Sequence, residues 1–193
     1  MTWFLIALVL LIAFGPVLWL VPSKKDKRVA ALRAKARSEG LLVEIRRLPV
    51  RDPTPEQRVS AGGMVRDPKL ECAAYGRMFR RKSRYLPGWR LIRAAADRGP
   101  DPFPDWQFDL RPKGEGRAHL EAMLAVVGPR LASLPEDAVA LEVDGRSAFV
   151  YWRERPGSTV EEVAGIAGIL GEIESELLAL DQRAAPGADQ ADS

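Results

Sequence analysis

The sequence predicts an α+β fold, in which an antiparallel sheet carries two or three packed helices behind one N-terminal transmembrane helix. Three observations predict this class. An uncharged apolar run covers residues 3–21, a hairpin pattern covers residues 138–155, and a long amphipathic helix pattern covers residues 158–182. The chain has 193 residues, which is enough for such an anchor and one domain of ordinary size.

The N-terminal run has the length and composition of a membrane-spanning helix. As a helix, residues 3–21 would extend roughly 28 Å, close to the roughly 30 Å hydrocarbon core of a bilayer. Most of these residues are Leu, Ile, Val or Phe, which together favour insertion by about 4–8 kcal/mol. Trp3 and Trp19 lie near the two ends, where indole rings favour the headgroup layer.

A cleavable signal peptide and a soluble core helix are the alternatives for this run. A signal peptide has a cationic start and a small-residue cleavage site, whereas here no charged side chain precedes Lys24. A soluble helix is rarely apolar on every face for five turns. We therefore expect an uncleaved anchor over residues 1–22.

A basic segment follows the anchor and predicts its direction. The cations directly after the apolar run are Lys24, Lys25, Lys27 and Arg28. Only the terminal amine opposes them on the other flank, so the positive-inside rule places the N-terminus outside and the rest of the chain in the cytoplasm.

Residues 23–40 read as a basic juxtamembrane helix. Ser23 and Asp26 have the spacing of a helix start, and Gly40 ends the pattern. Its apolar stripe is weak, so we expect the helix to lie against anionic headgroups, where each cation, Lys35 included, contributes about 1 kcal/mol. A solvated linker is the alternative.

The domain predicted for residues 41–183 begins with strands. Alternating or apolar segments predict strands at residues 41–48, 71–79 and 89–93. Residues 49–68 are rich in Pro and Gly and predict a surface loop, and residues 98–106 hold too many prolines for a helix or a central strand.

The second half of the domain is predicted as helix, hairpin and helix. Helical spacing covers residues 115–132, with Pro129 bending or ending that helix. Asp144 and Gly145 form the preferred two-residue turn of the hairpin, which places Leu141 opposite Ala148.

The last helix pattern, over residues 158–182, begins with a capping-box spacing of Ser158 and Glu161. Its apolar residues favour packing against the domain over a coiled coil, and its glycines at every third position permit close approach to a neighbour. Residues 184–193 have a tail-like composition that predicts disorder.

Charge is divided unevenly along the chain. Residues 1–98 carry 21 Lys and Arg against 8 Asp and Glu, and residues 99–193 carry 8 against 18. The basic connection of the first half contains Arg80, Arg81, Lys82 and Arg84 near Tyr85 and Trp89. This composition suits an anionic membrane surface or protein partner, and also single-stranded nucleic acid through charge and stacking.

Parts for catalysis are missing from the sequence. His119 is the only histidine and Cys72 the only cysteine, so the usual zinc, Cys–His and Ser–His–Asp arrangements are incomplete. Cys72 lies in an apolar segment that is typical of a small core residue. We assign no catalytic, cofactor-binding or metal-binding residue and no cofactor.

The helix and basic exit over residues 3–28 resemble the architecture of the YajC accessory subunit of the bacterial Sec translocase. The resemblance covers that part of the chain alone, and it transfers no residue role. The high Ala and Arg content also resembles that of small single-pass inner-membrane proteins of GC-rich bacteria.

These patterns predict a non-enzymatic accessory or scaffold protein of the bacterial inner membrane, whose cytoplasmic domain binds a protein partner beside the anionic leaflet. A membrane-tethered nucleic-acid-binding module is the first alternative. A small membrane-associated hydrolase or transferase is the second.

Overall fold

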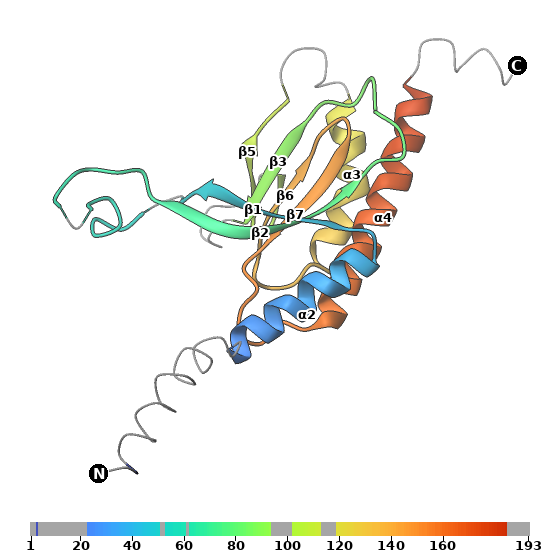
Figure 1. Ribbon diagram of the computed structural model, residues 1–193. Coiled ribbons are helices and arrows are strands. Elements are labelled where there is room, and N and C mark those ends of the chain that lie inside the picture. The colour runs from blue at the N-terminus through green and yellow to red at the C-terminus, as the bar shows by residue number, and fades with distance from the viewer. Residues whose placement is uncertain are drawn as a thin grey trace, which may run out of the picture.

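In the computed structural model, the described residues are 3, 23–50, 53–60, 62–93, 102–112 and 119–184. These residues form a seven-stranded antiparallel sheet with helices α2 (Lys24–Ser38), α3 (Leu120–Leu131) and α4 (Val160–Arg183) (Figure 1). The predicted α+β class is confirmed.

The predicted anchor lies outside the described residues, except for Trp3, which is helical and exposed. Among the helices that the structure does describe, none has both the length and the apolar composition that a membrane crossing needs. Trp19 and the tail from residue 185 onward also lie outside the described residues.

The sheet has the order β1-β2-β7-β6-β3-β5-β4, and all neighbouring strands are antiparallel. The strands are β1 (Leu42–Pro49), β2 (Lys69–Met78), β3 (Trp89–Arg93), β4 (Pro102–Phe103), β5 (Trp106–Leu110), β6 (Ala138–Val143) and β7 (Ser147–Trp152). The first three confirm the strands predicted before residue 94. The proline-rich segment contributes only the short edge strand β4, because proline has no N–H to give to a second neighbour.

The hairpin of β6 and β7 is confirmed, but its predicted register is wrong by two residues. Leu141 lies opposite Val150, and Val143 lies opposite Ala148. The Asp144 carboxylate accepts hydrogen bonds from the backbone N–H of Arg146 at 2.6 Å and of Ser147 at 2.8 Å. These bonds place the turn one residue later in the chain than predicted, so Asp144 precedes the turn and is not part of it.

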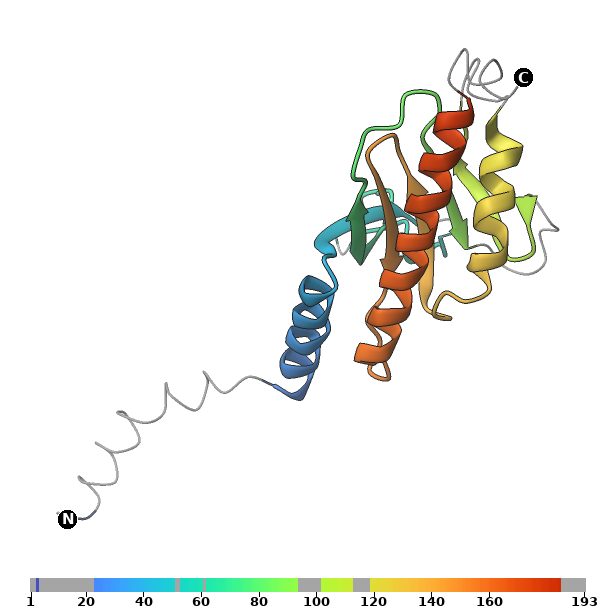
Figure 2. The same cartoon turned by 90° about the vertical axis from the view of Figure 1, so that its right-hand side faces the viewer.

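All three helices lie on one side of the sheet, as Figures 1 and 2 show together. The main core fills the space between them and the strands, and its largest fully buried side chains include Trp89, Trp152 and Tyr75. The opposite side of the sheet, which we call the helix-free face, has a second and smaller apolar cluster that includes Ala74, Ala140 and Phe149.

Helix α4 is confirmed with a different cap. Thr159 and Glu162 form the capping box, one residue after the predicted pair. The apolar stripe of α4 is buried, which confirms core packing, whereas Gly165 and Gly168 have no atom close to the position of a Cβ. Helix α3 begins at Leu120 and continues past Pro129, which lies within its last turn.

Helix α2 begins with the predicted capping box of Ser23 and Asp26. Its short apolar stripe packs into the main core, where Leu32 is 1% and Ala36 is 0% exposed. The Arg28 guanidinium also donates a hydrogen bond of 3.0 Å to the Pro156 carbonyl. The stripe that we expected to be too weak for a deep core is therefore part of it, and α2 is docked on the domain.

Candidate binding site beside helix α2

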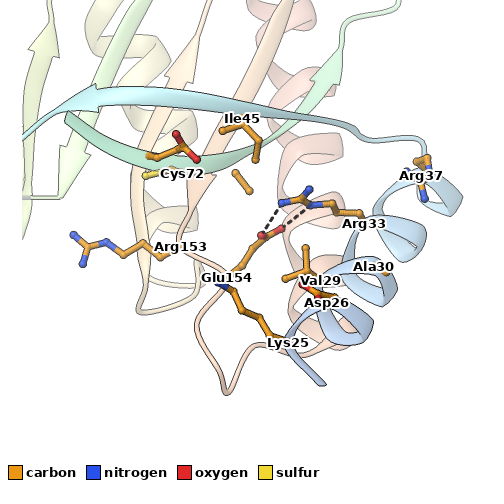
Figure 3. A pocket seen from close by; sticks show the side chains of 12 residues that line it. Lys25, Asp26, Val29, Ala30, Arg33, Arg37, Ile45, Cys72, Arg153 and Glu154 are labelled. Carbon is orange, nitrogen blue, oxygen red and sulfur yellow. Dashed lines mark hydrogen bonds and ion pairs between the residues drawn. The ribbon is translucent and has the colours of Figure 1, made fainter. Parts of the chain in front are cut away.

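A hollow of about 550 Å³ lies between α2 and the neighbouring strands (Figure 3). One wall is a single face of α2, on which Lys25, Val29, Arg33 and Arg37 recur at steps of four residues. The other walls come from β1, β2 and the segment after β7, and they include Ile45, Ala73, Arg153 and Glu154. We call this hollow the α2 groove.

An ion-pair network joins the two sides of the α2 groove. The Glu154 carboxylate accepts a hydrogen bond of 2.8 Å from the Tyr75 hydroxyl and forms a 3.2 Å ion pair with Arg33. Burial and the neighbouring Glu154 carboxylate raise the pKa of Tyr75, which stays protonated as the donor. Because Arg33 lies on α2, the network fixes the helix against the sheet.

The carboxylates that line the α2 groove all have partners. Asp26 accepts hydrogen bonds from Ser23 at the helix cap, Glu71 pairs with Arg47 at 3.3 Å, and Glu154 pairs with Arg33.

The remaining cations of the groove have no such partner. Within the part of the chain that the structure describes, the side chains of Lys25, Arg37 and Arg153 form no ion pair or hydrogen bond. Of these three, Arg153 extends away from the Arg33–Glu154 pair in Figure 3, and Lys25 lies next to the Asp26 carboxylate, whose hydrogen-bond partner Ser23 carries no charge.

Cys72 lines the groove only at its edge. Its side chain belongs to the apolar cluster of the helix-free face, and its sulfur points away from the Arg33–Glu154 pair (Figure 3). Burial raises the pKa of the Cys72 thiol, which disfavours the nucleophilic thiolate.

The other residue considered for chemistry lies elsewhere. His119 occupies the cap position of α3, outside the lining of the groove. The described residues contain no group of three His, Cys, Asp or Glu side chains arranged to hold a metal ion.

The predicted juxtamembrane cations divide into two groups. Lys24, Lys25 and Lys27 are exposed at the start of α2. Arg28 is half-buried against Pro156, and Lys35 forms a 2.6 Å ion pair with Glu39. The three lysines are thus the cations of this set that remain available to an anionic surface.

The predicted basic connection forms the loop between β2 and β3 and lies along the C-terminal half of α4. The buried Glu174 carboxylate accepts hydrogen bonds from the Arg77 side chain at 2.8 Å and from the Arg80 backbone N–H at 2.7 Å. Arg81 donates to the Leu178 carbonyl at 2.7 Å. These contacts fix the loop on its own chain.

A second buried carboxylate holds the same loop. Asp181 accepts hydrogen bonds from the Ser83 hydroxyl at 2.7 Å and from the backbone N–H groups of Arg84 and Tyr85 at 3.0 and 2.9 Å. The side chains of Arg80, Arg81, Lys82 and Arg84 remain exposed, and they form what we call the distal basic loop.

The two aromatic residues considered for base stacking differ in their exposure to solvent. Trp89 is fully buried in the main core, so it has no face free for base stacking, whereas Tyr85 is 37% exposed. The structure thus removes one of the two stacking residues on which the nucleic-acid alternative depended.

The two basic clusters lie at opposite ends of α4. The start of α2 lies beside the segment that leads into α4, whereas the distal basic loop contacts Asp181 near its C-terminal end (Figures 1 and 2). The 22 residues from Val160 to Asp181 span roughly 32 Å of helix. The structure does not bring the predicted cations together on one surface.

Charged side chains also cross the helix-free face as a polar ladder. It consists of Arg46, Tyr151, Glu142, Arg90 and Asp109, joined in that order by contacts of 3.1, 2.5, 3.1 and 2.7 Å. Neighbouring charges alternate in sign and are paired with one another. The ladder therefore covers the small apolar cluster beneath it and leaves no uncompensated charge for a ligand.

Glu174 and Asp181 hold the distal basic loop, and neither was predicted from the sequence. Both fall on the buried stripe of α4, at helical spacing from Leu170 and Leu177. A carboxylate that is buried on an apolar stripe needs a hydrogen-bond or ion-pair partner. The positions of Glu174 and Asp181 in the sequence therefore indicated that a basic segment packs against α4.

Comparisons with known proteins found no match to this chain among protein-family models, curated proteins or solved structures.

Proposed function

We propose that this chain is a membrane-anchored, non-enzymatic accessory or scaffold protein of the bacterial inner membrane, with a cytoplasmic domain that binds a protein partner. The observation that carries the proposal is the docking of α2. Its exposed lysines follow the predicted anchor directly, and Leu32 and Ala36 fix the helix in the main core. A helix fixed in this way holds the domain in one orientation relative to the point where the chain leaves the bilayer.

The distribution of charge supports separate roles for the two ends of the domain. The lysines at the start of α2 face the anionic leaflet, where each contributes about 1 kcal/mol. The distal basic loop lies at the other end of α4, where its exposed cations bind an acidic protein partner.

Charge reversal near the anchor tests the proposed orientation. Changing Lys24, Lys25 and Lys27 to glutamate removes the positive flank, and we expect a mixed or inverted topology because flanking cations set the direction of insertion. The ratio of periplasmic to cytoplasmic reporter activity, from reporters fused to the C-terminus, measures the change.

A matched control exists in the same chain. Changing Arg81, Lys82 and Arg84 to glutamate makes the same change in charge at the distal end, and we expect the orientation of the wild-type chain. If both triple variants kept a cytoplasmic C-terminus, the basic flank would not set the topology.

A further inference from the structure

We propose that strand β1 pairs with β1 of a second copy of this chain, antiparallel and with Ile45 opposite Ile45. The pairing joins the two seven-stranded sheets into one continuous sheet across a two-fold axis at that residue. It goes beyond the proposed function, because it uses β1 alone and does not depend on the anchor.

Of the two edge strands that the structure describes, β1 is the long one. It has eight residues and pairs with β2 without a bulge, and its proline is its last residue. The opposite edge strand, β4, has two residues, and the first is Pro102. A long and regular edge strand is a template for another strand unless bulges, prolines or a covering segment block it. Among the described strands, β2 is the only one that pairs with β1.

The backbone groups that β1 presents at this edge belong to Val43, Ile45 and Arg47. The Val50 N–H donates a hydrogen bond of 3.0 Å to the Pro68 carbonyl, which continues the β1–β2 ladder. Because bonded positions alternate along an antiparallel pair, the even-numbered residues of β1 bond to β2 and the odd-numbered ones point outward. No other described segment bonds to these outward N–H and C=O groups.

The charges of β1 select one register for a second copy. The axis must pass through a residue, because opposed side chains in a pair of strands point to the same face. With the axis at Ile45, Glu44 of each copy lies opposite Arg46 of the other. With the axis at Glu44 or at Arg46, that residue lies opposite itself, and like charges directly opposite are destabilising. The sequence of β1 is therefore complementary to itself about Ile45.

Glu44 and Arg46 have atoms free for this contact. Within one copy, the Arg46 Nε donates to the Glu44 Oε2 at 2.8 Å, and the Arg46 Nη1 donates to the Tyr151 hydroxyl at 3.1 Å. Among the described residues, the Arg46 Nη2 and the Glu44 Oε1 have no hydrogen-bond partner. In the proposed register these two residues form a pair without backbone bonds, in which the Cα atoms are only about 4.5 Å apart. The Nη2 of one copy can therefore donate to the Oε1 of the other.

The pairing also covers two exposed apolar side chains of β1. Ile45 is 51% and Leu42 is 44% exposed. Ile45 meets its own copy at the axis, on the helix side of the sheet. Leu42 lies opposite Leu48 of the second copy, which belongs to the small apolar cluster of the helix-free face. Removal of this apolar surface from water favours association.

The symmetry of the pairing is compatible with two anchors in one membrane. All three helices of one copy lie on one side of its sheet (Figures 1 and 2). A two-fold axis perpendicular to the sheet keeps the helices of both copies on that same side. Both α2 helices, which directly follow the predicted anchors, therefore lie on one side of the joined sheet.

Disulfide cross-linking of the full-length chain in a neutral detergent tests the register. In a Cys72→Ala background, Ile45→Cys places two thiols at a hydrogen-bonded pair, whose Cα atoms lie about 5.5 Å apart and within reach of a disulfide. We expect mild oxidation to give a covalent dimer. The matched control is Arg47→Cys in the same background, on the same strand and face, where the two cysteines lie about 13 Å apart along the strands and stay unlinked. Equal yields of dimer from the two positions would overturn the proposed register.

A proline at the axis tests the pairing itself. The Ile45 N–H does not bond to β2, so Ile45→Pro keeps the β1–β2 ladder and removes a donor that only a second copy uses. We expect native mass spectrometry to show a dimer for the wild type and at least a tenfold higher dissociation constant for Ile45→Pro, roughly, because the change acts twice across the axis. Ile45→Thr keeps the N–H and the branched side chain and is expected to remain dimeric. A monomeric wild type, or a dimer that Ile45→Pro leaves equally stable, would overturn the proposal.

Discussion

Replacing Asp181 with alanine is expected to lower the free energy of unfolding by about 3–5 kcal/mol. The Asp181 side chain is 3% exposed and accepts three hydrogen bonds from the distal basic loop. Alanine would leave the Ser83 hydroxyl and two backbone N–H groups without this partner, and desolvated donors are costly. Guanidinium unfolding of the full chain in detergent, followed by tryptophan fluorescence, measures the loss.

Asp181→Asn is the matched control, because its amide oxygen can still accept hydrogen bonds, and we expect a smaller loss of about 1–2 kcal/mol. Burial alone would raise the pKa of Asp181, but the hydrogen bonds from Tyr85, Ser83 and Arg84 lower it overall. A lowered pKa in the folded state stabilises the protein above the unfolded value of about 3.9, and the effect is lost as the pH falls through the folded pKa. The asparagine variant should therefore lose less stability between pH 6 and pH 3 than the wild type, and parallel curves would contradict the assignment.

Replacing Gly76 with alanine is expected to destabilise the fold by about 3 kcal/mol, through a clash on the helix-free face. A Cβ atom at this position would lie 2.0 Å from a carbon of the Phe149 ring. The ring has no room to move away, because Phe149 is 4% exposed and the Arg46 guanidinium lies 3.9 Å from its centroid. Alanine would force the ring to lift the polar ladder from the sheet.

A double-mutant cycle separates this clash from any effect of glycine on the strand. In a Phe149→Ala background the added methyl group has space, so Gly76→Ala should cost less than about 0.5 kcal/mol there, or stabilise slightly. The free energy of unfolding of the four chains gives the coupling. An equal cost of Gly76→Ala in both backgrounds would show that Phe149 is not the obstacle.

Local signals in the sequence predicted most of the fold. The spacing of Ser23 and Asp26 predicted the start of α2, and the alternation before residue 94 predicted three strands, because caps and side-chain periodicity depend on neighbours in the chain. The sequence allowed two positions, one residue apart, for the hairpin turn and for the cap of α4, and in both cases the predicted position was wrong. Asp144 flanks the hairpin turn instead of occupying it, and Thr159 replaces Ser158 as the cap of α4.

The candidate site could not be predicted in the same way, because its parts are distant in sequence. Arg33, Tyr75 and Glu154 come together only when α2, β2 and the end of β7 are in place. The weak stripe of α2 gave no sign of docking, since two buried residues are sufficient once Arg28 and Arg33 also bind the domain. The basic composition of the two clusters was evident, but their separation along α4 is a property of the tertiary fold.

The central claim is that an uncleaved N-terminal anchor holds the domain on the cytoplasmic side. Protease protection tests this claim most directly. The full-length chain with a C-terminal tag is treated with protease in intact spheroplasts and in inverted inner-membrane vesicles, and the mass of the undigested protein is recorded. We expect a mass that includes residue 1 and a tag that is digested only in the inverted vesicles. A mature chain that begins near residue 23, or a tag digested in intact spheroplasts, would contradict the claim.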